Sequence, residues 1–245
     1  MLNLLERNLK LRIRFKPWAR NELETSPFYI DNPQDMKNKW KTAFENDNKI
    51  YLELGCGKGN FIAKASKNNP DINYIAIDLV DAMLGMAKRN VEAAYGIRKS
   101  TDAEEIENEI EKEKIVKNLK LTRYDISNIS NIFGKDDEIK KIYINFCNPW
   151  PKGKHHKKRL THERQLEQYK TFLKGELYFK TDDDELFEAS INSLKNSGYS
   201  IVKVTYDLEN ENNFWEDEEN IETEHEKMFT SQGIKIKALI AKINV

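Results

Sequence analysis

The residues best suited to chemistry lie in segment 145–159. Residues 145–152 read Asn-Phe-Cys-Asn-Pro-Trp-Pro-Lys, and five Lys or Arg and two His fall between positions 152 and 159. The apolar run 142–144 predicts a buried strand, and the prolines leave Asn148 and Trp150 at its carboxyl end, where open α/β sheets bind ligands. An amide, an aromatic ring and a cationic loop suit a nucleobase on a phosphate backbone. The alternative is a strand-ending turn followed by a solvated charged loop.

A second motif, Glu-Leu-Gly-Cys-Gly-Lys-Gly at residues 53–59, lies between a short strand start and a helical pattern. The alternate glycines, Gly55 and Gly57, let the backbone turn sharply and approach a ligand closely. A dinucleotide fingerprint requires a third glycine or alanine at the position that Asn60 occupies. Glu53 would repel a pyrophosphate but favours nearby positive charge. The amino and sulfonium groups of S-adenosylmethionine meet that requirement.

Two aspartates follow apolar strand patterns farther along the chain. Asp78 ends the pattern 74–77, about where a ribose-binding acid follows a first βα unit, and its two oxygens can accept from both ribose hydroxyls. The alternative for Asp78 is a cap on the following helix. Asp125 ends the pattern 119–124 and is predicted to reach the adenine side of the same pocket. Its alternative is an ordinary turn aspartate.

Charge is segregated along the chain although the net charge of the 245 residues is only −1. Hydrophobic residues make up 39%, enough for a substantial core, and charged residues 33%, which indicates a heavily solvated surface. Acids concentrate at 102–113, 182–188 and 209–226, and bases at 7–20 and 152–159. Attraction to nucleic acid must therefore come from local patches rather than from a global field.

The chain has no long apolar run of the kind that spans a membrane or directs secretion. Its two cysteines, Cys56 and Cys147, give neither a disulfide framework nor a metal-site spacing. The sequence therefore predicts a cytoplasmic protein that has no resident metal and does not associate with membranes.

Strand patterns alternate with helical patterns from residue 50 onward, which predicts one α/β domain built on a mainly parallel sheet. The predicted strands lie near 50–54, 73–77, 119–124, 140–146, 175–180, 199–207 and 234–243. Only acidic sequence separates the last two, which favours an antiparallel final pair.

The segments outside these strands divide the chain into a basic extension with a helix, 1–45, and a single domain, 46–245. Pro33 can open a helix in which Met36, Trp40 and Phe44 form an apolar stripe. Residues 101–104, Thr-Asp-Ala-Glu, resemble a capping box that opens an acidic, solvated helix to about Lys117.

Several motifs together resemble the bacterial tRNA (guanine-N7-)-methyltransferases, which methylate a guanine in the tRNA variable loop. The similarity extends from residue 14 to the carboxyl end. It includes the motifs at 53–59, 145–152, 156–160, 179–182 and 223–226. The Pro-Trp-Pro-Lys block with its basic tail is specific to this family, whereas the glycine loop is not. The resemblance implies a Rossmann-like, S-adenosylmethionine-dependent methyltransferase fold: a seven-stranded, mostly parallel sheet with an antiparallel last strand and helices on both faces.

The resemblance also assigns roles to individual residues. Cofactor binding falls to Glu53, Gly55, Gly57, Asp78, Asp125 and Asn148, and catalysis to Asn148. Contacts to tRNA fall to Lys152, Lys154, His155, His156, Lys157, Lys158, Arg159, Asp182, Thr223, Glu224, His225 and Glu226. The family usually has aspartate at position 148 and often tyrosine at position 225, and the acidic insertion is longer than expected.

Guanine N7 carries an in-plane lone pair and no proton, so its methylation needs positioning rather than a general base. A carboxylate at position 148 would stabilise the developing cation, and an amide can still orient the base by hydrogen bonds. Trp150 is placed either to stack on a base or to pack on the sheet end. Two other functions stay open, an exocyclic-amine methyltransferase and a non-catalytic tRNA-binding protein. The sequence also leaves open a monomer or a homodimer.

Overall fold

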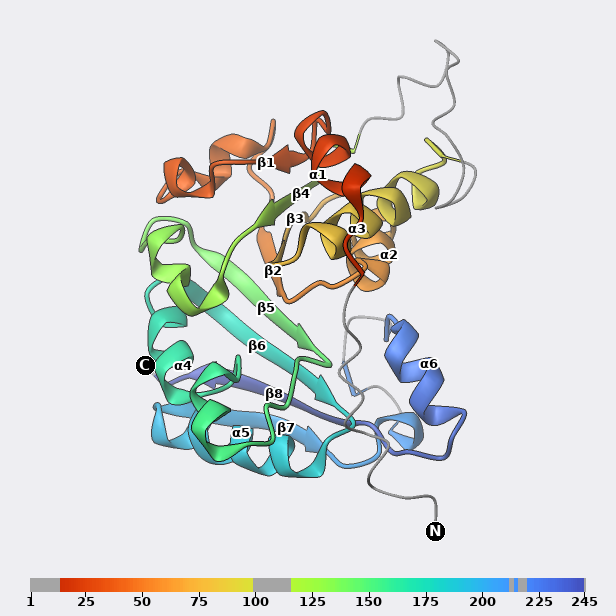
Figure 1. Ribbon diagram of the computed structural model, residues 1–245. Helices are drawn as coiled ribbons and strands as arrows, with labels where there is room; N and C mark the ends of the chain where they lie inside the picture. Colours follow the sequence, from red (N-terminus) through yellow and green to blue (C-terminus); the bar gives the residue numbers. More distant parts are fainter. Residues whose placement is uncertain (1–13, 99–115, 212–213, 216–219, 245) are drawn as a thin grey trace.

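The structure is a computed structural model that describes residues 14–98, 116–211, 214–215 and 220–244 (Figure 1). Most of the predicted acidic helix, including its capping box at 101–104, lies outside the described residues. The first three bases of the predicted basic extension, Arg7, Lys10 and Arg12, lie outside them as well.

The described residues form one mixed sheet in the order β1-β4-β3-β2-β5-β6-β8-β7. The strands are β1 Tyr29–Ile30, β2 Ile50–Leu54, β3 Asn73–Asp78, β4 Leu119–Arg123, β5 Ile139–Asn145, β6 Leu173–Thr181, β7 Tyr199–Thr205 and β8 Lys237–Ile243. All neighbours pair in parallel except β8, which is antiparallel to both β6 and β7. All seven predicted strands are present, as β2 to β8, and the last strand is antiparallel as predicted. The sheet has one further strand, β1, which was not predicted because its two residues are too few to show an alternating pattern.

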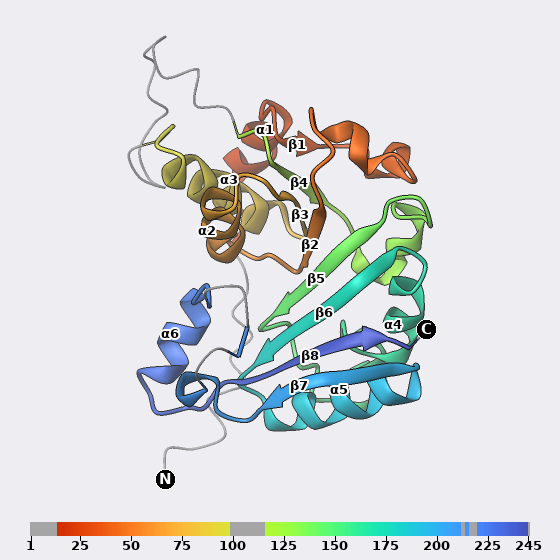
Figure 2. The ribbon, with the colours of Figure 1, turned by 180° about the vertical axis from the view of Figure 1, so that it is seen from behind.

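Helices cover both faces of the sheet, as predicted (Figures 1 and 2). The α-helices are α1 Pro17–Glu24, α2 Asn60–Asn68, α3 Asp81–Ala94, α4 Glu163–Tyr169, α5 Asp184–Asn196 and α6 Glu224–Thr230. The 3₁₀ helices are η2 Pro33–Met36, η3 Trp40–Ala43, η5 Ile126–Asn131, η6 Gly153–Lys158 and η7 Leu208–Asn210. One core cluster joins the sheet to α4 and α5, and the other joins it to α1, α2, α3 and Trp215.

Side-chain alternation decides which strand residues share a face. In β5, Ile142 and Ile144 belong to the core under α4 and α5, whereas Tyr143 belongs to the core under α2. Asn145, two residues after Tyr143, therefore lies on the α2 face at the carboxyl end of the strand. The same alternation places Glu53 of β2 and Lys180 of β6 on that face.

The predicted helix from Pro33 to Phe44 is wrong. The segment forms η2 and η3 instead, and Asn38 between them has a φ of 62°. The carboxylate of Asp137 explains the break, since it accepts the backbone N–H groups of Asn38 and Trp40 at 2.9 and 3.1 Å. The apolar residues are nevertheless core residues, with Trp40 fully buried and stacked on Phe133.

The amino-terminal segment is fastened to the sheet through α1, which packs on α3. The guanidinium group of Arg89 lies 3.4 Å from the ring centre of Trp18 and also bonds the Glu22 carboxylate. Buried Arg98 contacts the same carboxylate at 3.7 Å. The domain division at residue 45 stays a prediction.

None of the described helices is long and apolar enough to cross a membrane.

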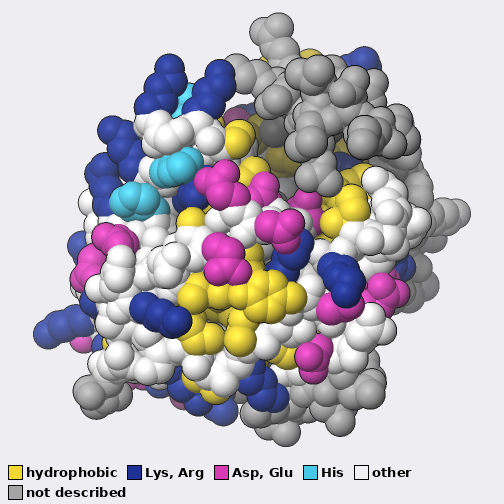
Figure 3. All heavy atoms as spheres, turned by 90° about the horizontal axis from the view of Figure 1, so that it is seen from below, with side chains coloured by type: hydrophobic (Ala, Val, Ile, Leu, Met, Phe, Trp, Pro, Cys, Tyr) yellow, Lys and Arg dark blue, Asp and Glu magenta, His cyan; other side chains and the backbone are white. Residues whose placement is uncertain are grey.

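The β7 strand forms one edge of the sheet. Its side chains Val202 and Val204 are exposed, as is Tyr206, which follows the strand. Hydrophobic side chains gather in the middle of the face that Figure 3 shows.

Candidate active site

The strand order reverses between β2 and β5, because the chain runs outward from β2 through β3 to β4 and then returns to β5. In open α/β sheets, ligands bind at this switch point, outside the carboxyl ends of the strands. The glycine motif follows β2 and the Asn148 loop follows β5. The two motifs singled out in the sequence therefore lie side by side.

Glu53 is the most unusual acid at this edge, because its side chain is buried and only half satisfied. The residue is 2% exposed, and its Oε1 accepts a hydrogen bond from Asn145 Nδ2 at 3.2 Å. Its Oε2 has no hydrogen-bond partner among the described residues. Burial raises the pKa of Glu53 to about 8, against the lowering effects of Asn145 and Lys180. An orphaned acceptor of this kind suits a ligand that brings a donor with positive charge.

The glycine loop joins Glu53 to Asp78 through backbone contacts. Gly55 and Gly57 have φ values of 76° and 53°, which side chains rarely permit. The N–H of Gly57 donates to Asp78 Oδ2 and the N–H of Val80 to Oδ1, both at 2.9 Å. Each carboxylate oxygen keeps a second lone pair, so Asp78 can still accept from two hydroxyls. Burial raises the pKa of Asp78.

Asp125 lies one strand farther out, after β4. Its side chain is exposed and accepts the N–H of Ser127 at 2.9 Å, which caps η5 as an aspartate in a turn does. Asp125 also lines a surface cavity of about 340 Å³ with Leu79, Arg123 and Arg20. Asp125 thus follows β4, the neighbour of the strand that ends in Asp78, and its adenine contact stays a prediction.

Asn148 lies in a tightly turned loop after β5. Its side chain is exposed, and its Oδ1 accepts the N–H of Trp150 at 3.0 Å. Phe146 and Trp150 both have positive φ values, 52° and 46°, which are uncommon for such residues and occur at functional sites. The Trp150 ring is half-buried between Lys158, 4.8 Å from its centre, and the edge of His155. The amide therefore supports the turn as well as facing solvent.

The basic run forms the 3₁₀ helix η6, and most of its charges point outward. Lys152, Lys154, Lys157 and Lys158 are exposed, whereas His155 and His156 are partly buried. Figure 3 shows Lys, Arg and His side chains gathered at the upper left of one face. Arg159 differs from the rest: it is 4% exposed, donates to Pro149 O at 2.7 Å and pairs with Glu185 at 2.8 Å. Its position favours holding the turn over meeting a phosphate.

The carboxyl-terminal motif reaches the same edge through the start of α6. Thr223 and Glu226 are buried and form a reciprocal capping box. Glu224 is exposed and bonds Lys58 and Asn60 of the glycine loop. His225 is exposed and its ring stacks on Phe146, 5.8 Å away between ring centres. These contacts bring residues 223–226 against both other motifs.

Asp182 lies at the end of β6, where its backbone carbonyl accepts a hydrogen bond from Lys237 Nζ at 3.0 Å. The side chain of Asp182 is partly exposed. The structure therefore places it at the same edge of the sheet as the other predicted tRNA contacts.

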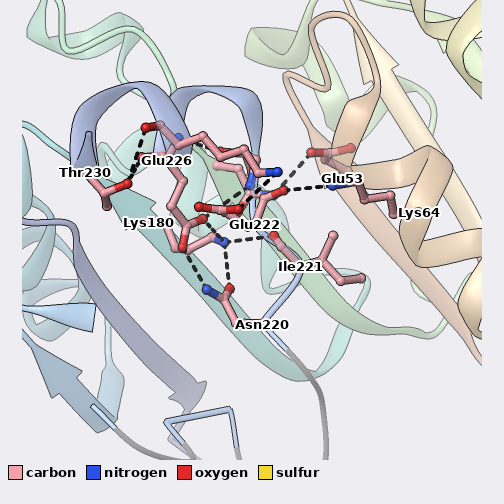
Figure 4. A network of polar contacts seen from close by, with 11 residues as sticks. Glu53, Lys64, Lys180, Asn220, Ile221, Glu222, Glu226 and Thr230 are labelled. Atoms are coloured by element: carbon pink, nitrogen blue, oxygen red, sulfur yellow. Dashed lines mark hydrogen bonds and ion pairs between the residues drawn. The ribbon is translucent and has the colours of Figure 1, made fainter. Parts of the chain in front are cut away.

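Two residues that the sequence did not single out complete the site. Asn145 bonds Glu53, and Lys180 on β6 is buried at 3% exposure and bonds Glu226 at 2.8 Å (Figure 4). A lysine inside an apolar strand pattern was the available signal for Lys180. Both line a cavity of about 260 Å³ on the α2 face. Its other walls include Phe61, Tyr74, Tyr143, Tyr178, Trp215 and Asn220.

Comparison with other sequences gives a consistent result. A family described as "Putative methyltransferase" matches residues 47–239. A tRNA (guanine-N(7)-)-methyltransferase from Clostridium beijerinckii is 56% identical over 233 residues, covering 94% of this chain and 98% of the relative. Proteins of the same name from Clostridium perfringens and Acetivibrio thermocellus are 51% and 46% identical, each covering 95% of this chain and 99% of the relative.

Comparison with solved structures supports the fold alone. The 16S rRNA methyltransferase KamB aligns with a TM-score of 0.56 at 13% identity, over 84% of this chain and 93% of KamB. At that identity the similarity concerns the arrangement of strands and helices and not the substrate.

Proposed function

Because the chain belongs to the tRNA (guanine-N(7)-)-methyltransferase family, we propose that it transfers the methyl group of S-adenosylmethionine to N7 of a guanine in the tRNA variable loop. The protein is a methyltransferase, and we place it in the cytoplasm. The observation that carries the specific proposal is the meeting of three motifs at the switch point. They are the half-satisfied Glu53, the Asn148 loop with its basic helix, and residues 223–226.

The residues present fit the cofactor. Glu53 Oε2 is a buried acceptor in need of a positively charged donor, which the amino group of S-adenosylmethionine supplies. Asp78 keeps lone pairs for the ribose hydroxyls, and Gly55 and Gly57 leave the backbone open to close approach. Asp125 and Asn148 border the same edge, on the adenine and methyl sides respectively. The cofactor contributes an activated methyl group, and these residues hold and orient it.

The transfer itself requires alignment of the guanine N7 lone pair with the sulfur–methyl bond. The methyl–sulfur bond breaks as the nitrogen–carbon bond forms, and positive charge passes to the guanine ring without loss of a proton. Asn148 stands where it can orient the base, because its loop lies next to the glycine motif across β2 and β5. An amide stabilises the developing cation less than a carboxylate would.

Two groups of residues bind the tRNA. Exposed lysines attract its phosphates, and the carboxyl-terminal motif 223–226 contacts it beside the glycine loop. The exposed lysines of segment 152–158 supply phosphate contacts, which fix position but read no sequence. Residues 223–225 lie against the other two motifs, through the contacts of His225 with Phe146 and of Glu224 with Asn60. We assign Arg159 and Glu226 to holding these elements in place, since both are buried and bonded within the protein.

The proposal is tested by incubating the protein with unmodified tRNA and methyl-labelled S-adenosylmethionine, then mapping the labelled nucleoside by mass spectrometry. The expected product is N7-methylguanosine in the variable loop. Label in N6-methyladenosine would instead support an exocyclic-amine methyltransferase. Binding of tRNA without any label transfer would support a non-catalytic binding protein.

A further inference from the structure

Lys180 is a buried ammonium group whose partners come from one short stretch of chain. Its Nζ lies 2.8 Å from Glu226 Oε2, 3.1 Å from Asn220 Oδ1 and 3.3 Å from the carbonyl oxygen of Ile221 (Figure 4). The residue projects from β6, 46 positions before Glu226 in the sequence. One side chain of the sheet thus bonds both ends of segment 220–226.

Glu226 connects Lys180 to the start of α6. Its Oε2 accepts the N–H of Thr223 at 3.4 Å, and its Oε1 accepts from Asn220 Nδ2 at 2.7 Å. Two other contacts of the segment, Lys58 with Glu224 and Lys64 with the Glu222 carbonyl, are exposed. Exposed contacts contribute little to stability, whereas removing one partner of a buried ion pair such as Lys180–Glu226 is strongly destabilising.

We propose that Lys180 is a positioning residue for tRNA: it holds residues 223–226 in place through Glu226. The inference rests on the proposed function, since it takes residues 223–226 as tRNA contacts.

The test uses the double variant Lys180→Met/Glu226→Gln beside the single variant Lys180→Met. The single variant leaves Glu226 buried without its cation, which destabilises the fold. The double variant removes both charges, preserves side-chain volume, and keeps an acceptor at position 226 for Thr223 and a donor or acceptor for Asn220. Lys88→Met is the matched control. It removes another buried lysine, on α3, and leaves its partner Glu92 bonded to Arg98 at 3.0 Å.

Two measurements separate positioning from simple structural support. The first is the affinity for S-adenosylmethionine by calorimetry, which should stay at the parent value in the folded double variant and in Lys88→Met. The second is single-turnover and steady-state kinetics with tRNA, where kcat/KM should fall about tenfold or more, chiefly through KM.

The outcomes are distinct. A folded double variant with the parent KM for tRNA overturns the role of Lys180, and so does an equal rise of KM in Lys88→Met. Weakened cofactor binding in the double variant would assign Lys180 a general structural role and overturn the proposal as well. If the parent protein transfers no methyl group to guanine N7, the proposed function fails, while equilibrium binding of tRNA to the parent and the double variant still tests Lys180.

Discussion

At the scale of single residues, the buried carboxyl group of Glu53, proposed as a cofactor contact, lowers the stability of the free protein. A carboxyl group that is fully enclosed and has one acceptor unused is costly in the free protein. The arrangement is useful only when a ligand supplies the absent donor. Such local costs at functional positions are common in enzymes, and replacing the responsible residue often stabilises the fold.

The first prediction concerns Glu53→Gln. The pKa of Glu53 is about 8 in the fold against 4.5 for the free side chain. Between those values the unfolded chain has released a proton that the folded protein retains, so Glu53 lowers stability as pH rises through this window. Glu53→Gln should therefore stabilise the unliganded protein on the order of 2 kcal/mol at neutral pH, with the gain vanishing near pH 4.5.

Urea unfolding at acidic and neutral pH checks this prediction, and calorimetry should show that Glu53→Gln weakens S-adenosylmethionine binding about tenfold or more. Glu167→Gln, which alters an exposed ion pair with Lys170, is the control. Loss of stability at neutral pH, or unchanged cofactor affinity, would contradict the assignment.

The second prediction concerns Asn148, which supports the Trp150 turn through its Oδ1. Asn148→Asp keeps an acceptor for that N–H and adds negative charge beside the developing guanine cation, so its single-turnover rate should equal or exceed that of the parent. Asn148→Ala removes the acceptor and should lower the rate at least about tenfold, with a modest loss of cofactor affinity and little change in tRNA affinity.

Thermal unfolding of both Asn148 variants beside their rates distinguishes catalysis from turn support. A purely structural role predicts that the Ala variant loses stability before it loses rate. A parent-like rate together with parent-like stability in Asn148→Ala would remove Asn148 from the site.

At the scale of elements, the basic residues of η6 and its end have two different roles: Arg159 is buried and holds the helix in place, and the lysines are exposed. Arg159 is enclosed and bonded to Pro149 O, which fixes the end of the helix, while Lys154, Lys157 and Lys158 stay at the surface. A rigid basic helix needs less ordering on binding than a flexible basic segment would.

The third prediction follows from this division. Replacing Lys154, Lys157 and Lys158 by Gln should reduce the slope of log affinity for tRNA against log salt by roughly one unit for each phosphate that the variant no longer neutralises. Filter binding or fluorescence titration at several salt concentrations measures the slope. Lys49→Gln/Lys174→Gln, two lysines at the opposite edge of the sheet, should leave it unchanged. Equal slopes for the triple variant and the parent would assign the phosphate contacts elsewhere.

The strands were predictable because each combines an apolar run with a short length, and β2 to β8 lie within a few residues of their expected positions. The helix at 33–44 was not, since its apolar spacing is genuine but Asp137, about a hundred residues away in the chain, draws the backbone into two 3₁₀ turns. Periodicity reports burial and not the competing hydrogen bonds that tertiary structure supplies.

The candidate site was likewise only partly predictable from the sequence. Glu53, Asp78 and Asn148 could be proposed from the sequence because each lies at, or shortly after, the carboxyl end of a predicted strand. The pairing of Lys180 with Glu226 could not, because it depends on which strands become neighbours. The enclosed position of Arg159 was equally hidden, since a basic run looks uniform until the chain folds.

At the scale of the whole molecule, a net charge of −1 leaves attraction to tRNA to local lysines, whereas the proposed cofactor contact Glu53 is buried. The fourth prediction is that the two affinities respond differently to salt. Four phosphate contacts from the exposed lysines of 152–158 imply about a 10²-fold loss of tRNA affinity between roughly 50 and 200 mM salt. Binding of S-adenosylmethionine, measured by calorimetry in the same buffers, should change far less. A parallel loss of both affinities would contradict this division.

The position of β8 has a consequence for how the protein is made. This strand lies between β6 and β7 and pairs with both, although it follows them in the chain. While synthesis is in progress, β7 has no neighbour in the sheet, and the edge of β6 stays open until residue 243 has left the ribosome. The amino-terminal strands can assemble early, but the last third must close in one late, long-range step. The nascent chain therefore completes the sheet only after that step, and until then the open edge of β6 can pair with other strands.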